Sequence, residues 1–384
     1  MSFRRSVDDD KLPMHRRISN AIATAIEDGQ YGPGGALPSE QRLASDFGVS
    51  RGTLRQALAA LRADGYIEVV PGRGTFVRLT TPKRPDTRRR VVGVVVPSVS
   101  RPALPELLGA VEDELHRRGY SMLVASSGNS RAQEAGRLRR VLDEGVSGLI
   151  AYPLDQQPDS EVYAGLARQR FPVVFVDRHL VGVPVDAVLA DNVGGAYALV
   201  SHLIERGHRR IAFVSSDNVG TTSVIERLQG YEQAIQAHGI ARDASLVFTG
   251  LPTVPTHPEE QERVSEENAA RIKSFLAERR PMPTAVFALH DRIARSVLEA
   301  AIWLRLQVPR DLAIVGFDDD PIAATLPVPL TTVAQPREQI GRTAARLVVD
   351  RIEGRRSDVA RIVLPTRLVI RASSQTPRVV VAAG

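Results

Sequence analysis

Hydroxyl and guanidinium side chains follow one another between residues 37 and 58 at spacings that suit contact with a polyanion. Ser50 stands where its hydroxyl can cap a helix, and Arg51 and Arg55 then share one side of that helix. The opposite side carries three apolar residues, Leu54, Leu58 and Leu61. Arginine donates a bidentate pair of hydrogen bonds to guanine O6 and N7 or binds phosphate, and Thr53 can bind a phosphate near the helix start. This spacing predicts a helix that presents its basic side to a DNA groove.

A glycine-flanked arginine follows this helix after a short apolar segment, as Gly72-Arg73-Gly74. The two glycines allow the tip of a β-hairpin to approach DNA closely, and Arg73 suits a narrow groove or the phosphate backbone. A helix break at Gly48-Val49 and a second capping residue, Ser39, precede the arginine-bearing helix. Together these features predict a winged helix-turn-helix domain over residues 10–78.

A second set of polar side chains follows apolar segments that have the character of buried strands. The set comprises Ser98 to Arg101, Asp177-Arg178, His290-Asp291 and Asp318-Asp319-Asp320. In doubly wound sheets, ligands bind outside the carboxyl ends of the strands. Carboxylates and an arginine that face one cleft suit a polyhydroxylated ligand, because Asp accepts from hydroxyls and Arg donates to oxygens. The alternative is that these residues cap helices or pair with one another.

Regular elements must position both sets. Apolar spacing predicts a helix over residues 15–28, and the proline- and arginine-rich residues 79–90 form a linker. Apolar strands then alternate with amphipathic helices, which indicates βαβ units and a parallel sheet with helices on both faces. We expect a fold of class α/β in which residues 91–371 form a two-lobed doubly wound domain, followed by a loose tail over 372–384. Lobe 1 is expected at about 91–192 and 318–335, and lobe 2 at about 193–317 and 336–371.

Composition narrows the class of protein. The chain has 384 residues, is 43% hydrophobic and contains no cysteine, so it can build several cores but no disulfide or thiolate site. No signal peptide begins it and no run approaches the roughly 18 apolar residues of a membrane span, so we expect a cytoplasmic protein without membrane contact. The formal charge of +6 arises within residues 1–90, which places a polyanion partner at that end.

Residues 15–77 resemble the DNA-binding domain of the GntR family of bacterial regulators. The resemblance rests on Leu-Pro-Ser-Glu at 37–40, on Gly-Val-Ser-Arg-Gly-Thr-Leu-Arg at 48–55 and on Gly-Arg-Gly-Thr-Phe-Val at 72–77. Gln41 and Gly52 depart from the common pattern, so a phosphate contact moves to Arg42 or is lost and base reading at Gly52 weakens. The resemblance implies DNA contacts by Ser39, Arg42, Ser50, Arg51, Thr53, Arg55, Gly72 and Arg73.

Residues 90–371 resemble the effector domain of LacI/GalR-type regulators, which is related in fold to periplasmic sugar-binding proteins. The matching segments include Pro172-Val-Val-Phe-Val-Asp-Arg178, 202–214 and 309–319. The resemblance implies an effector site built from Ser98, Arg101, Ser127, Arg178, Asp191, Arg227, His290, Asp291 and Asp318. His290 stands where Asn or Ser is usual and Arg101 where Asn is usual, which favours an acidic or phosphorylated ligand.

The whole chain thus resembles hybrid regulators that join a GntR-type head to a LacI-type body, as arabinose-responsive repressors do. The resemblance implies a homodimeric repressor that binds operator DNA under the control of a small sugar-like effector, without cofactor or metal. A regulator that senses a nucleobase or a sugar phosphate is the alternative. An enzyme with a DNA-binding head is disfavoured. GntR-type heads are also fused to pyridoxal-phosphate aminotransferase-like bodies, which require a Schiff-base lysine, but the only lysine beyond residue 83 is Lys273, on the polar part of a predicted helix. No nucleophile or phosphate-loop motif occurs either.

Overall fold

The computed structural model describes residues 13–27, 29–32, 34–63, 65–70, 73–78, 90–99, 101, 104–154, 160–253 and 258–375. The chain forms two compact units, residues 1–89 and residues 90–384, and each is described by itself. The predicted Gly72, most of the predicted linker and residues 376–384 of the predicted tail lie outside the described residues. Among the helices in the described part of the chain, none has both the length and the apolar character needed to cross a bilayer.

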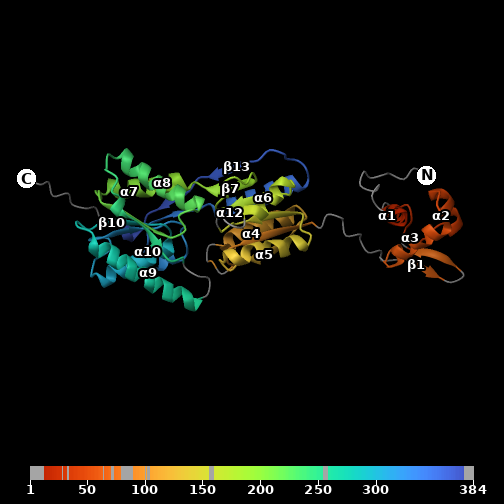
Figure 1. Cartoon of the computed structure of the whole chain (residues 1–384), viewed down its shortest axis with the longest axis horizontal. Coiled ribbons are helices and arrows are strands. Elements are labelled where there is room, and N and C mark those ends of the chain that lie inside the picture. The colour runs from red at the N-terminus through yellow and green to blue at the C-terminus, as the bar shows by residue number, and fades with distance from the viewer. Residues whose placement is uncertain are drawn as a thin grey trace, which may run out of the picture. The chain divides into compact units, whose positions relative to one another are not determined.

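The first unit is a winged helix-turn-helix, as predicted (Figure 1). Its elements are α1 (Met14–Glu27), α2 (Glu40–Phe47), α3 (Arg51–Ala63), β1 (Ile67–Val70) and β2 (Gly74–Val77). The turn between α2 and α3 uses Gly48 at φ 65°. Glycine adopts this left-handed conformation without strain. The apolar stripes of the three helices meet in one core, where Ile22, Leu54 and Leu61 are at most 1% exposed.

The second unit begins with a six-stranded parallel sheet in the order β13-β7-β6-β5-β3-β4. Its strands are β3 (Val91–Val96), β4 (Ser121–Ser126), β5 (Gly148–Ala151), β6 (Val173–Val176), β7 (Asp186–Ala190) and β13 (Arg361–Leu364). Helices α4 (Leu104–Arg117) and α12 (Arg337–Ile352) contribute to one core cluster with this sheet, and α5 (Arg131–Asp143) and α6 (Ser160–Arg168) to another. We call this sheet and its helices lobe 1.

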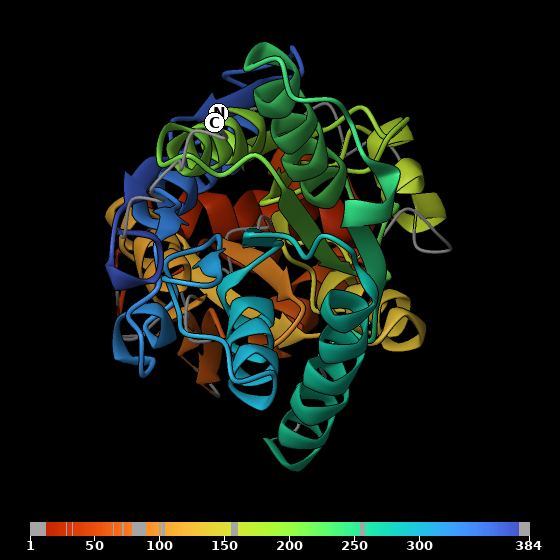
Figure 2. The same ribbon diagram turned by 90° about the vertical axis from the view of Figure 1, so that its left-hand side faces the viewer.

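Lobe 2 contains a four-stranded parallel sheet in the order β11-β10-β8-β9, which a helix pair covers on each side (Figure 1 and Figure 2). The strands are β8 (Ile211–Ser216), β9 (Val247–Leu251), β10 (Ala285–Ala288) and β11 (Ala313–Val315). One helix pair is α7 (Asn192–Glu205) with α8 (Thr222–Ala237), and the other is α9 (Pro258–Glu278) with α10 (Asp291–Trp303). The remaining elements are η2 (Ala244–Leu246), α11 (Ile322–Thr325), η3 (Ala372–Ser374) and the antiparallel pair β12 (Thr332–Ala334) and β14 (Arg367–Val369). The predicted two-lobed α/β domain is confirmed.

The predicted division between the lobes is wrong after residue 317. We expected 318–335 in lobe 1 and 336–371 in lobe 2, but α12 packs against α4 and the strands β5 to β7, and β13 pairs with β7. A Cβ atom on Gly148 of β5 would lie 2.8 Å from Val348 Cγ2, so α12 contacts the lobe 1 sheet directly. Leu330 and Val333 instead belong to the core of lobe 2. The chain therefore crosses between the lobes near residues 191, 335 and 365.

The start of the predicted loose tail is also ordered, which corrects that expectation. Ser373 and Ser374 are at most 1% exposed. The Ser373 hydroxyl donates to the Ile314 carbonyl at 2.6 Å and accepts from the Thr331 amide at 2.8 Å. Ser374 Oγ lies 2.9 Å from His202 Nε2. These bonds attach the segment to β11 and α7, because buried hydroxyl groups need such partners.

Candidate DNA-binding surface and effector site

Two of the three hydroxyl groups predicted to contact DNA, those of Ser39 and Ser50, cap helices in the head. Ser50 Oγ accepts from the Thr53 amide at 3.2 Å and lies 2.9 Å from Thr53 Oγ1, at the start of α3. Ser39 Oγ accepts from the Arg42 amide at 3.3 Å at the start of α2. Amide groups at both helix starts are thereby satisfied, as the sequence predicts. Ser50 and Thr53 still stand at the exposed, positive end of α3, where a phosphate is favoured.

The arginines of the head lie on its surface. Arg51, Arg55 and Arg73 are all exposed. Arg55 Nε donates to Glu40 Oε2 at 2.9 Å, so this guanidinium forms an ion pair with the first residue of α2. Arg73 lies between β1 and β2 of the wing, beside Gly74 at φ 119°, and its guanidinium lies 6.0 Å from the Phe76 ring. The head thus presents basic groups on both the recognition helix and the wing.

A cavity of about 410 Å³ lies between the lobes of the second unit. The carboxyl ends of strands from both sheets reach it, which is the place where ligands bind in such folds. The walls carry Pro97, Arg101, Asn129, Leu154 and Arg178 from lobe 1 and Ser216, Asp217, Asn218, Thr221, Val224, Pro252, Thr253, Leu289, His290, Arg292 and Ile293 from lobe 2. A smaller pocket of about 70 Å³ shares Arg101, His290 and Arg292 with it. We call the two cavities together the inter-lobe cleft.

In lobe 1, a tyrosine and two arginines form a cluster on the cleft wall. Tyr152 OH accepts from Arg178 Nη2 at 3.2 Å and from Arg101 Nη1 at 3.3 Å. Arg178 also donates to Asp177 Oδ2 at 3.2 Å and to the Leu154 carbonyl at 3.0 Å, and its guanidinium lies 4.8 Å from the Tyr152 ring. Burial raises the pKa of the Tyr152 hydroxyl, and Asp177 raises that pKa further. The cluster therefore holds two charged donors and a neutral phenol.

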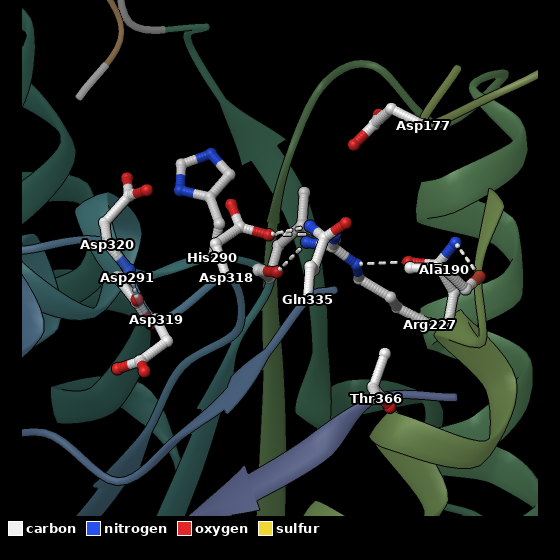
Figure 3. A network of polar contacts seen from close by, with 12 residues as sticks. Asp177, Ala190, Arg227, His290, Asp291, Asp318, Asp319, Asp320, Gln335 and Thr366 are labelled. Carbon is white, nitrogen blue, oxygen red and sulfur yellow. Dashed lines mark hydrogen bonds and ion pairs between the residues drawn. The ribbon is translucent and has the colours of Figure 1, made fainter. Parts of the chain in front are cut away.

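Arg227 of α8 joins segments of the second unit that are distant in sequence (Figure 3). Its guanidinium donates to Asp318 Oδ1 at 3.0 Å, to Asn192 Oδ1 at 3.0 Å and to the Leu289 carbonyl at 2.8 Å. The same group lies 3.8 Å from the Phe317 ring centre. Burial opposes ionisation of Asp318, but Arg227 and neighbouring positive groups hold the pKa of this carboxyl below its ordinary value. Arg227 is only 5% exposed, so its donors are used within the protein.

Asp291 is a structural residue of lobe 2. The carboxylate, 0% exposed, accepts from the Thr332 hydroxyl at 2.6 Å and from the Asp320 amide at 2.8 Å. Burial raises the pKa of Asp291 well above its usual value, and Asp318 adds to the rise. The two hydrogen bonds that Asp291 accepts hold β12 and residues 318–320 beside α10.

His290 caps α10 with its ring. Nδ1 accepts from the Ile293 amide at 3.3 Å. The proton of the neutral ring therefore sits on Nε2. Burial, with Arg101, Arg227 and Arg292 nearby, lowers the pKa of His290 to about 3, although Asp318 opposes the change. The imidazole is therefore a neutral donor in the cleft.

The structure brings four of the nine predicted effector residues to the cleft, namely Arg101, Arg178, His290 and Asp318. The other five do not line it: they are Ser98, Ser127, Asp191, Arg227 and Asp291. Ser127 is 1% exposed and donates to the Val96 carbonyl at 3.5 Å, and Ser98 is 4% exposed. Asp191 caps α7, where its Oδ1 accepts from the Gly194 amide at 2.7 Å. Of these five residues, Asp191 caps a helix and Arg227 pairs with Asp318, which are the roles that the alternative interpretation gives.

Sequence reasoning missed several cleft residues. Asp217 and Asn218 directly follow β8, so the strand-end rule applied to that strand would have found them. Arg292 adjoins the predicted His290-Asp291 pair and had the same signal. Arg337 lines the smaller pocket from the start of α12, and no local sequence pattern predicts this position. Within the described residues, no group of three or more His, Cys, Asp or Glu could hold a metal ion.

Comparison with known proteins agrees with this architecture. Residues 14–77 match the family described as bacterial regulatory proteins, gntR family, and residues 200–374 match a periplasmic binding protein-like domain. An arabinose metabolism transcriptional repressor from Geobacillus stearothermophilus is 31% identical over 370 residues, which cover 95% of this chain and 98% of that protein.

Solved structures show the same likeness. The transcriptional regulator CelR in complex with cellobiose has a TM-score of 0.65 at 30% identity and covers 88% of this chain and 100% of that one. A LacI family regulator from Enterococcus faecium with bound ribose has a TM-score of 0.62 at 26% identity and covers 75% and 99% of the two chains.

The winged helix-turn-helix and the two-lobed body with its central cleft define a DNA-binding transcriptional regulator with a periplasmic-binding-protein-like domain. More narrowly, this chain belongs to the family of regulators that join a GntR-type head to a LacI-type body, which includes the Geobacillus arabinose repressor. The predicted family and fold are confirmed.

Proposed function

We propose that this protein is a cytoplasmic repressor that binds operator DNA as a homodimer and that a sugar-like effector in the inter-lobe cleft controls this binding. The cleft carries the proposal, because strand ends from both lobes supply carboxylate, guanidinium and amide groups to its larger cavity. The relatives support it: an arabinose metabolism repressor matches nearly the whole chain, and CelR and an Enterococcus regulator have solved structures with cellobiose and ribose. These relatives are transcription regulators, and enzymatic activity forms no part of the proposal.

Effector binding acts through the relative positions of the lobes. The His179 amide donates to Thr222 Oγ1 at 3.1 Å, and Arg361 Nη2 lies 2.6 Å from Glu226 Oε1, so groups of lobe 1 contact α8 of lobe 2. A ligand that contacts both lobes favours a closed arrangement by its difference in affinity for the closed and open states. In a dimer, that difference changes the spacing of two recognition helices on the half-sites of an operator.

In the head, we propose that Ser39, Arg42, Ser50, Arg51, Thr53, Arg55, Gly72 and Arg73 contact the duplex. The exposed arginines of α3 and the wing support this assignment. Phosphate contacts release counterions, so each lost contact lowers the slope of log affinity against log salt by about 0.9.

The test begins with selection of an operator from a random duplex library by the full-length protein. Operator affinity is then measured with and without a panel of pentoses, hexoses, sugar acids and sugar phosphates. We expect at least one compound to change that affinity and to raise the melting temperature, since a ligand at about 100 times its dissociation constant stabilises by about 2.7 kcal/mol. Arg51→Ala and Arg73→Ala should each weaken operator binding and reduce the salt slope, whereas the exposed body variant Arg305→Ala should not. If both head variants bind as the wild type does, the assignment of the DNA surface fails.

A further inference from the structure

Two arginines of the inter-lobe cleft have no acidic partner among the described residues. Arg101 comes from lobe 1 after β3, and Arg292 is the second residue of α10 in lobe 2. Both line the larger cavity and the smaller pocket. Arg101 donates to the Tyr152 hydroxyl at 3.3 Å, and neither guanidinium forms an ion pair within the described part of the chain. Arg178 on the same wall is instead paired with Asp177.

The two arginines also oppose each other. Burial lowers the pKa of Arg292, and the positive charge of Arg101 lowers it further. Asp318 and Asp320 act in the opposite direction but do not outweigh these effects. Two like charges that reach one cavity from different lobes resist closure, and an anion placed between them removes that cost.

A third donor stands beside the arginines without adding charge. His290 lines both parts of the cleft, and because its Nδ1 accepts from the Ile293 amide, its Nε2 carries a proton. A neutral N–H donor next to two guanidinium groups suits an oxygen-rich anion such as a carboxylate or a phosphate, which accepts several hydrogen bonds at once.

The smaller pocket offers an acceptor for hydroxyl groups. Asp320 is 8% exposed, and its Oδ1 has no hydrogen-bond partner within the described residues. The ion pair of this oxygen with Arg337 is 3.6 Å long, beyond hydrogen-bond range. A buried carboxylate oxygen without a donor costs free energy, which a ligand hydroxyl would recover. Asp318, the partner of Arg227, lines the same pocket.

We propose that the effector is an anionic carbohydrate, whose carboxylate or phosphate lies between Arg101 and Arg292 and whose hydroxyl groups donate to Asp320 and Asp318. This inference rests on the proposed function, since it names the class of ligand that the inter-lobe cleft takes. Sugar acids and sugar phosphates share the chemistry that these groups recognise. The experiment distinguishes the two.

Matched ligands test the charge requirement on the full-length protein. Calorimetric titration and thermal shift compare glucose with gluconate, glucuronate and glucose 6-phosphate, and arabinose with arabinonate and arabinose 5-phosphate. We expect at least one anionic compound to bind at least about tenfold more tightly than its neutral parent, because hydrogen bonds to a charged group contribute about 1.5–3 kcal/mol. Preference within the anionic set shows whether the ligand carries a carboxylate or a phosphate.

Variants test the residues. Arg101→Gln and Arg292→Gln should each lower the affinity for the anionic ligand by about tenfold or more. Each should change the affinity for the neutral parent sugar by less than about twofold. Arg292→Gln should leave the melting temperature of the ligand-free protein unchanged or raise it, because it removes a repulsion. Arg305→Gln, at an exposed position outside the cleft, is the matched control and should bind both ligands as the wild type does.

The outcomes separate this inference from the proposed function. If neutral sugars bind as tightly as their acids and phosphates and the two cleft variants bind like the wild type, the inference is wrong while the cleft remains a sugar site. If no carbohydrate of any kind binds or changes the melting temperature, the proposed effector function itself fails.

Discussion

Replacement of Arg227 by alanine tests how much one buried guanidinium stabilises the second unit. The side chain is 5% exposed, and its bonds to Asp318, Asn192 and the Leu289 carbonyl measure 3.0, 3.0 and 2.8 Å. Arg227→Ala removes all three donors and the contact with the Phe317 ring. Asp318 then keeps Gln335, which donates to it at 2.7 Å, but loses its charged partner.

The expected cost follows from the burial of this ion pair. Loss of one partner of a buried pair costs about 3–5 kcal/mol, because the other charge stays desolvated. The Asp318 side chain is 23% exposed, so water and Gln335 relieve part of the penalty. The lower end of the range, about 3 kcal/mol, therefore applies. At about 2–4 °C per kcal/mol for a unit of this size, the melting temperature should fall by about 6–12 °C.

The stabilisation from the Arg227–Asp318 pair should also depend on pH, in a direction that the pKa of Asp318 defines. Because Asp318 has a pKa below its ordinary value when folded, the stabilisation is present above the ordinary carboxyl pKa and is lost as pH falls through the lowered value. The gap in melting temperature between wild type and Arg227→Ala should therefore narrow in acid. A double variant, Arg227→Ala with Asp318→Asn, should cost less than the two single changes together, by about 0.5–3 kcal/mol.

Tryptophan fluorescence reports on the right part of the molecule. The single tryptophan, Trp303, lies at the end of α10 in the second unit, so its emission during heating follows that unit and not the head. Arg263→Ala, at an exposed position of α9, is the control and should melt within about 2 °C of the wild type. The reasoning is refuted if Arg227→Ala also melts within about 2 °C of the wild type at pH 7.

Two further predictions concern the second unit. His290 has a folded pKa of about 3 against about 6.5 when unfolded, so the unfolded state binds the extra proton and stability should fall by about 2 kcal/mol between pH 7 and pH 5. His290→Asn keeps a capping side chain but lacks this component, so denaturant unfolding at the two pH values should show a smaller loss, and an equal loss would contradict the assignment. The Arg361 to Glu226 contact joins the lobes across a partly exposed surface, so Glu226→Gln should weaken effector binding by at most about fivefold, as titration calorimetry would show. Tighter binding by that variant would mean that the contact opposes closure.

Local patterns identified the head almost completely. The caps Ser39 and Ser50, the turn at Gly48 and the buried Leu54 and Leu61 lie where the spacing predicts them. Capping and helical periodicity act over a few residues, so they can be recognised without knowledge of the tertiary contacts. In the body, the same periodicity identified the alternation of strands and helices.

Assignment of elements to lobes could not be made in that way. The apolar face of α12 predicts that this helix is buried but not against which sheet, and β13 is only partly buried. The structure packs α12 against β5 to β7 and pairs β13 with β7. The order of crossings depends on contacts between segments that lie far apart in the chain, such as Leu364 with Ala190. Such pairings leave no local pattern, so the prediction assigned residues 318–335 and the segment of α12 and β13 to the wrong lobes.

The amino-acid sequence by itself determined the two kinds of domain, the basic recognition helix and the polar strand ends, because residue type and short-range spacing decide these features. Only the tertiary structure decided which polar groups face the cleft. Arg227 and Asp291 form hydrogen bonds with other groups of the protein. Arg101 and Arg292 both line the cavity, and neither forms an ion pair among the described residues. The reason is that a side chain is available to a ligand only when folding has left its charge uncompensated, and compensation comes from segments distant in the chain.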